Sequence, residues 1–114
     1  MVKIIITENL FEEINKKFNN KEANEIIDLI ETLEQSPKKG KEIGTIGGIV
    51  IKELKYNKFR FYFITDGYKL KCLKVEELKD LVIKVVKMSG KKDQERVINE
   101  IKFVLRNLGH DGFH

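Results

Sequence analysis

One strand-like segment of this 114-residue chain carries an arginine that needs an explanation. In KFRFYFIT (58–65), alternation puts Lys58, Arg60 and Tyr62 on one face of the strand and three phenylalanines on the other. A guanidinium presents a planar fork of donors that suits phosphate. A cation at this position therefore requires either an acidic neighbour or an anionic ligand.

Further cations are expected near Arg60. Lys55 lies across the predicted hairpin, close to its turn, and Lys91 and Lys92 directly precede the last predicted helix, whose first turn adds free N–H groups. Such a site could cleave RNA without a metal, because the ribose 2′-hydroxyl attacks its own phosphate and cations stabilise the charge that develops. A lysine of lowered pKa or a tyrosine would transfer the proton, and Tyr62 could stack a base.

The alternative is purely structural. Glu53, on the neighbouring strand, could pair with Arg60, and the lysines would then only solvate one face of the sheet.

Charge is unevenly distributed along the chain, whose net charge is +4. Residues 1–47 carry seven lysines and nine acidic residues, a net charge of −2, whereas residues 48–114 carry 15 basic and nine acidic residues, a net charge of +6. The basic excess therefore belongs to the strand-rich half, which favours an anionic partner such as nucleic acid or an acidic protein segment. A lysine-rich solvated surface, reflecting genome composition or growth at high temperature, explains the same numbers.

Other kinds of site find little support. Cys72 has no partner thiol, and the potential metal ligands His110, Asp111 and His114 lie in a terminal segment without rigid spacing, so neither a metal site nor a cofactor is expected. The glycine-rich segment 38–48 leaves a helix and enters a strand, the reverse of a phosphate-binding loop. No apolar run is long enough for a membrane span, and the single cysteine is typical of a reducing cytoplasm.

The hydrophobic pattern predicts an α+β fold of order β-α-α-β-β-β-β-α, with a mostly antiparallel twisted sheet, two N-terminal helices packed on one face and a C-terminal helix. Thr7 is expected to cap the first helix, Pro37 to stop the second, and Gly109 to end the last. Residues 1–109 should form a single domain and 110–114 a flexible tail. The predicted strands are 2–6, 49–55, 58–65, 68–75 and 81–88, and the predicted helices are 8–19, 21–35 and 91–108.

The element order and the run from LIETLEQSPKKGKEI through IKELKYNKFRFYFIT to VVKMSGKKDQERVINEIKFVL resemble the RelE/ParE superfamily of toxins from toxin–antitoxin modules, most of all its RelE and HigB-like branches. The resemblance covers nearly the whole chain. Glu53-Leu54-Lys55 and Phe59-Arg60-Phe61 match the family's two strand motifs, and Lys91-Lys92 matches its basic pair after the last strand.

The resemblance implies a small cytoplasmic toxin, neutralised by a cognate antitoxin, that cleaves mRNA in the ribosomal A site. It gives Arg60 a contact with the scissile region and makes Lys52 a candidate for substrate binding, although strand alternation sets Lys52 on the core side. Where relatives carry a tyrosine or histidine, this chain offers Met88, Ser89, Gln94 and Ile98. The alternatives are a ParE-like gyrase inhibitor without nuclease activity and a relative that only binds an antitoxin. Monomer and dimer both stay open.

Overall fold

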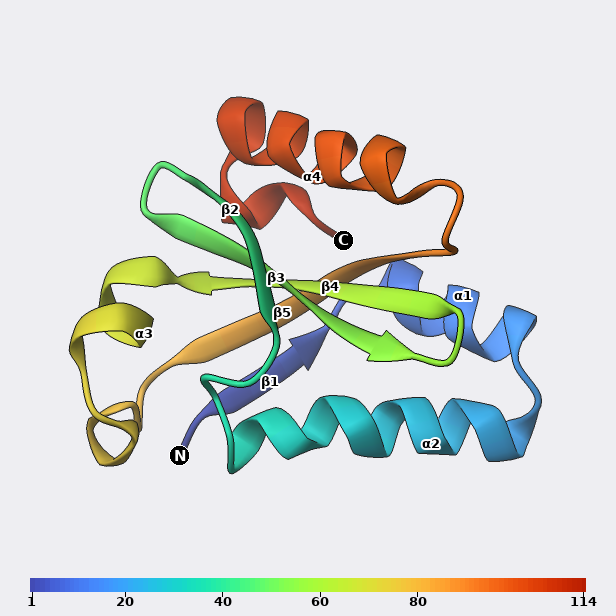
Figure 1. The fold of residues 1–114 in the computed structure, drawn as a ribbon, viewed down its shortest axis with the longest axis horizontal. Coiled ribbons are helices and arrows are strands. Elements are labelled where there is room, and N and C mark those ends of the chain that lie inside the picture. Colours follow the sequence, from blue (N-terminus) through green and yellow to red (C-terminus); the bar gives the residue numbers. More distant parts are fainter.

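Five strands form one mixed sheet in the order β1-β5-β4-β3-β2 in the computed structural model, which describes residues 1–114 (Figure 1). The outer strand β1 runs parallel to β5, and the other neighbours are antiparallel. The elements are β1 (Lys3–Ile6), α1 (Glu8–Lys17), α2 (Asn20–Glu31), β2 (Lys41–Ile46), β3 (Ile49–Tyr56), β4 (Phe59–Asp66), α3 (Gly67–Cys72), β5 (Val82–Ser89) and α4 (Gln94–Leu108).

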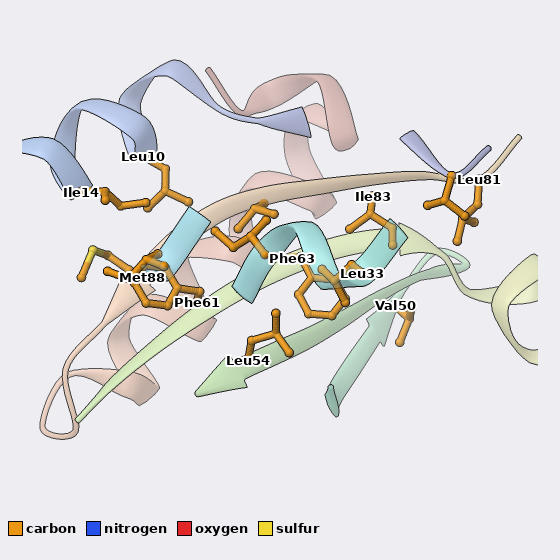
Figure 2. Close-up of a cluster of buried hydrophobic side chains, with 14 of the residues drawn as sticks. Leu10, Ile14, Leu33, Val50, Leu54, Phe61, Phe63, Leu81, Ile83 and Met88 are labelled. Carbon is orange, nitrogen blue, oxygen red and sulfur yellow. The ribbon is translucent and has the colours of Figure 1, made fainter. Parts of the chain in front are cut away.

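The face of the sheet that carries Phe59, Phe61 and Phe63 packs against α1 and α2, as the alternation of β4 predicts. Phe61 and Phe63 are fully buried, and Phe59 is half-buried with its ring edge-on to Phe18 at 5.0 Å between centroids. Figure 2 shows part of this larger core, to which both helices and three strands contribute. Because β4 is flanked by strands on both sides, its phenylalanines lie at the centre of this core.

The opposite face is covered by α4, which lies across the sheet from α1 and α2, and by the C-terminal segment through Phe113 (Figure 1). Its smaller core holds Tyr62, Ile64 and Val86 from the sheet against Val97 and Ile101 from the helix. One helix is narrower than a five-stranded sheet, so part of this face stays open.

The predicted helix ends agree with the structure at two positions. The Thr7 hydroxyl accepts a hydrogen bond from the backbone N–H of Leu10 at 3.4 Å, which caps α1. Gly109 follows α4 with φ of 71°, a left-handed conformation that glycine adopts without strain.

Two predicted elements are wrong in detail, although the fold class holds. Residues 68–75 form the short helix α3 and part of a 3₁₀ turn instead of a strand, because the Asp66 side chain caps the helix by accepting from Lys69 N–H at 3.0 Å. Residues 41–46, predicted as loop, form the edge strand β2. It reverses into β3 through Gly47 and Gly48, both with positive φ.

The expected flexible tail, 110–114, is also corrected. Phe113 is buried in the smaller core, the His114 carbonyl accepts from Asn9 N–H at 2.9 Å, and the Lys84 ammonium donates to the His110 carbonyl at 3.0 Å. The last aromatic side chain anchors the segment, so the tail belongs to the folded structure. No helix of the chain has the length and apolar character required to cross a membrane.

Candidate functional site

Two neighbouring strands bring the predicted catalytic residues Lys55 and Arg60 together at one corner of the open face, and β5 adds Ser89. Arg60 pairs with Lys55 across the β3–β4 hairpin and with Ser89 at the end of β5. Directly opposed residues on neighbouring strands have their Cβ atoms about 5 Å apart. The side chains of Lys55, Arg60 and Ser89 therefore form a row across the sheet, on the face that α4 covers only in part.

Arg60 takes part in no salt bridge. Its guanidinium donates one hydrogen bond, from Nη1 to the Lys58 carbonyl at 3.3 Å, and the residue is half-buried. Glu53, the alternative partner, lies opposite Tyr62 instead, and its Oε2 is buried without a hydrogen-bond partner. The Arg60–Glu53 ion pair is thus absent, and the other guanidinium donors make no hydrogen bond within the protein.

The loop that follows β5 adds two exposed lysines, Lys91 and Lys92. Asp93 closes this loop by accepting from Gly90 N–H at 2.8 Å, and its other oxygen pairs with Arg96 at 3.1 Å. These bonds hold the loop at the start of α4, where unpaired helix N–H groups add partial positive charge. The two lysines directly follow Ser89 and Gly90 in the chain, so they extend the row of cations.

Tyr62 shares a face with Arg60 but is fully buried under α4, which corrects its predicted role in stacking a base. Its hydroxyl and that of Ser89 form a hydrogen bond of 2.8 Å. Burial raises the pKa of the Tyr62 phenol above 10.0, while the Ser89 hydrogen bond and Arg60 act in the opposite direction. Tyr62 thus supports the floor beneath the corner and presents no ring face to a ligand.

Lys52 lies on the other face, as strand alternation indicates, and does not join Arg60. It is 5% exposed, and its ammonium donates to the Lys38 carbonyl at 2.7 Å. Burial lowers the pKa of Lys52 below 10.5, and nearby Glu42 partly offsets this. Lys52 is therefore removed from the substrate-binding set at this corner, whereas Lys58, exposed in the β3–β4 turn, stays next to Arg60.

The arrangement favours electrostatic binding of a phosphate chain. Positive charge at this corner comes from Arg60, Lys55, Lys91 and Lys92, and Arg60 forms no salt bridge with a carboxylate. Both histidines lie in the C-terminal segment and not on the strands that form this row. The cations of this corner can thus stabilise negative charge on a phosphate. A lysine would have to serve as the proton-transfer group. No group of three or more His, Cys, Asp or Glu side chains comes together in a way that could hold a metal.

Sequence reasoning missed the parts that Ser89 and Asp93 play at this corner. In the sequence Ser89 stands out only as one of the residues at a position where relatives carry tyrosine or histidine, yet in the structure it is the buried partner of Tyr62. Asp93 caps nothing with its side chain but closes the lysine loop. The short spacing in SGKKD was a usable signal, because an aspartate three residues after a glycine can close a tight loop.

A comparison of the whole fold with solved structures gives a clear match. A chain of the archaeal RelE–RelB complex from Pyrococcus horikoshii OT3 superimposes with a TM-score of 0.60, covering 80% of this chain and 96% of that one at 12% identity. The fold is RelE-like. No protein-family model and no curated protein sequence matches the chain. The match agrees with the α+β fold class predicted from the sequence, and at 12% identity the likeness concerns the fold alone.

Proposed function

We propose that this protein is a RelE/HigB-like toxin that cleaves mRNA on the ribosome. The observation that carries the proposal is Arg60. Arg60 lies in register between Lys55 and Ser89 and forms no salt bridge. The loop that follows Ser89 carries the exposed pair Lys91-Lys92. The RelE-like fold supports the same conclusion.

In this proposal a water molecule accepts the proton of the substrate's 2′-hydroxyl as that oxygen attacks the adjacent phosphorus, a 2′,3′-cyclic phosphate forms, and the 5′-oxygen leaves. Arg60 binds the phosphate oxygens and stabilises the phosphorane, because its remaining donors make no hydrogen bond within the protein. Lys55 lies next to Arg60 and donates a proton to the leaving oxygen, whereas Lys91 and Lys92 bind flanking phosphates. The reaction needs no metal in this scheme.

The proposed partners are the ribosome with its mRNA and a cognate antitoxin protein. The similar solved structure is described as a RelE–RelB complex, which supports a protein partner of that kind for this chain. Cytoplasmic action follows from the ribosomal target.

Induced expression in a bacterial host tests the proposal. We expect translation to stop and RNA 5′-end mapping to show new cuts in coding sequences at a constant position within codons. Arg60→Ala combined with Lys91→Ala should abolish both effects, because the phosphate oxygens lose a bidentate donor and a second charge. Arg106→Ala combined with Lys16→Ala is the matched control, since both residues are exposed and lie outside the corner. Arrest that persists in the first pair would reject the proposal.

A second candidate is a toxin-like chain that acts by binding alone. The observation that favours it is the buried state of Tyr62, together with the absence of histidine from the corner. Growth arrest with intact mRNA and inhibited gyrase supercoiling would indicate a ParE-like inhibitor. Absence of toxicity, with stable binding to the product of a neighbouring gene, would indicate a relative that only pairs with an antitoxin.

A further inference from the structure

A second basic site lies on the other side of the sheet. A pocket of about 480 Å³ opens between the β2–β3 hairpin and α3, well within the size range of small-molecule sites. Lys38, Lys52 and Lys71 line it, with Glu42 as the single acidic side chain. None of the residues of the Arg60 corner takes part in it.

The walls of this pocket are tied together at several points. Gly67 N–H donates to the Gly48 carbonyl at 2.9 Å, which joins the start of α3 to the hairpin turn. A side chain at residue 67 would place its Cβ 2.9 Å from that carbonyl oxygen, so glycine permits the approach. At the other end, the Lys38 ammonium donates to the Leu73 carbonyl at 2.7 Å. The walls of the pocket are therefore joined by one backbone–backbone hydrogen bond and one lysine–carbonyl hydrogen bond, neither of which requires a ligand.

Lys52 is the central polar group of the pocket. Its side chain rises from the β3 strand, its residue is only 5% exposed, and one N–H of its ammonium is satisfied by the Lys38 carbonyl. An ammonium has three donors, which leaves two for a ligand. Glu42 acts on Lys52 through its charge but forms no salt bridge with it.

The rest of the lining indicates what kind of anion fits. Three lysines and one glutamate leave a net charge of +2, which matches the charge of a phosphate monoester near neutral pH. Val50 and Leu70 provide apolar surface beside the lysines, and Tyr68 stands 72% exposed at the rim, where its ring is free to lie against a planar group.

We propose that this pocket, between β2, β3 and α3, binds a small phosphate monoester whose phosphate contacts Lys52 and Lys71 and whose body lies against Leu70 and Tyr68. The site is separate from the Arg60 corner and does not depend on the proposed nuclease activity. It assigns to Lys52 a ligand-binding role on the face opposite to the one that the RelE resemblance implied.

Titration of the ¹⁵N-labelled full-length protein with adenosine monophosphate, followed by NMR, tests the proposal. We expect amide shifts at residues 38, 48, 52 and 67–72, saturating at millimolar concentrations, and no such shifts with adenosine, which lacks the phosphate. Lys52→Met and Lys71→Met should each weaken binding roughly tenfold or more, because each removes a charge-assisted hydrogen bond. Lys16→Met, which removes an exposed lysine of α1, is the matched control and should bind within about twofold of the parent.

Three results would overturn the proposal. They are shifts confined to the Arg60 corner, equal binding of adenosine and adenosine monophosphate, and Lys71→Met binding as well as Lys16→Met. Lys71 is exposed, so this variant decides the test even where Lys52→Met fails to fold. Because the mRNA-cleavage test reports on Arg60 and this titration on Lys52, failure of one proposal is distinguishable from failure of the other.

Discussion

Phe61 and Tyr62 are neighbours on β4, and both are completely buried, yet they face two different environments. Phe61 points into the larger core, which two helices and the loop after α2 close off from water. Tyr62 points into the smaller core beneath α4, where its hydroxyl still needs a partner and finds Ser89. The face under α1 and α2 thus forms the main apolar core, whereas the face under α4 contains buried polar groups and a corner that α4 does not cover.

The difference explains where the chain can place unpaired charge. On the closed face, a lysine must be desolvated, and Lys52 lies where that face reaches the β2 edge, with a carbonyl partner and a lowered pKa. On the face that α4 covers only in part, Arg60 is half-buried, the three nearby lysines are exposed, and none of these cations forms a salt bridge. A half-covered sheet lets a small domain carry a cationic site without the cost of burying it.

The largest effect is expected from Phe61→Ala, which opens a cavity in the larger core. We expect a loss of about 3–5 kcal/mol in the free energy of unfolding, measured by chemical denaturation. Phe103→Ala is the control, because Phe103 lies on α4 and is 66% exposed, and its loss should stay within about 0.5 kcal/mol. Equal losses in the two variants would mean that the face under α1 and α2 is not the main core.

A smaller effect is expected from Tyr62→Phe, which removes only a hydroxyl from the face under α4. The Ser89 hydroxyl then loses its buried partner, so we expect a loss of about 1–2 kcal/mol. Ser89→Ala should cost a similar amount, and the double variant should cost less than the sum of the two, as a double-mutant cycle would show. Strict additivity would contradict a direct hydrogen bond.

Lys52 should give the stability of the protein a distinctive pH dependence. Its pKa is lower in the folded state than its ordinary value of 10.5, so above the folded pKa the unfolded chain binds more protons at this site. The contribution of Lys52 is therefore unfavourable at neutral pH and becomes less so as the pH rises toward 10.5. Chemical denaturation should show that the free energies of unfolding of the parent and of Lys52→Met converge or cross as the pH rises. Because the pKa of Tyr62 is raised, its own contribution falls above pH 10.0 in both proteins and cancels in the difference. If the difference in unfolding free energy between the two proteins does not change with pH, the proposed desolvation of the Lys52 amine is wrong.

The smallest effect is expected from Arg96→Ala at the start of α4. Arg96 pairs with Asp93 at 3.1 Å and with Glu100, and all three side chains are partly exposed, so we expect a loss of about 0.2–1 kcal/mol. Asp93→Ala should cost more, since it also removes the acceptor of Gly90 N–H that closes the lysine loop. Denaturation in low and high salt separates the ion-pair contribution from the hydrogen-bond contribution, because salt screens only the ion pair. If Arg96→Ala loses the same free energy of unfolding at both salt concentrations, its effect does not come from the ion pair.

Much of the architecture could be predicted from local patterns. Alternation in KFRFYFIT assigned Phe61 to the core and Arg60 to the other face, and the spacing of Leu10 and Ile14 predicted an amphipathic α1. Predictions failed where a short segment satisfied two patterns. In YKLKCLKV, Lys69 and Lys71 alternate as in a strand, while Leu70 and Leu73 recur at helical spacing. The segment forms a helix because the Asp66 side chain caps it.

The candidate site was predicted in composition but not in geometry. Lys55 and Arg60 were expected across a hairpin, and the register agrees. Tyr62 was expected at the surface, because no sequence pattern indicates that α4 folds back over it. The docking of the tail through Phe113 could not be read from HDGFH either, since a single aromatic residue carries no periodicity.

The sequence by itself determined which residues alternate in β4, where α1 begins and where α4 ends, because these depend on neighbours a few positions apart. It also determined that the basic excess belongs to the strand-rich half. Only the tertiary structure decided that Arg60 has no acidic partner, that Tyr62 is buried with Ser89, and that Lys52 lies in a pocket of its own. Those outcomes depend on strand register and on which face each helix covers, and both are set by contacts between residues far apart in the chain.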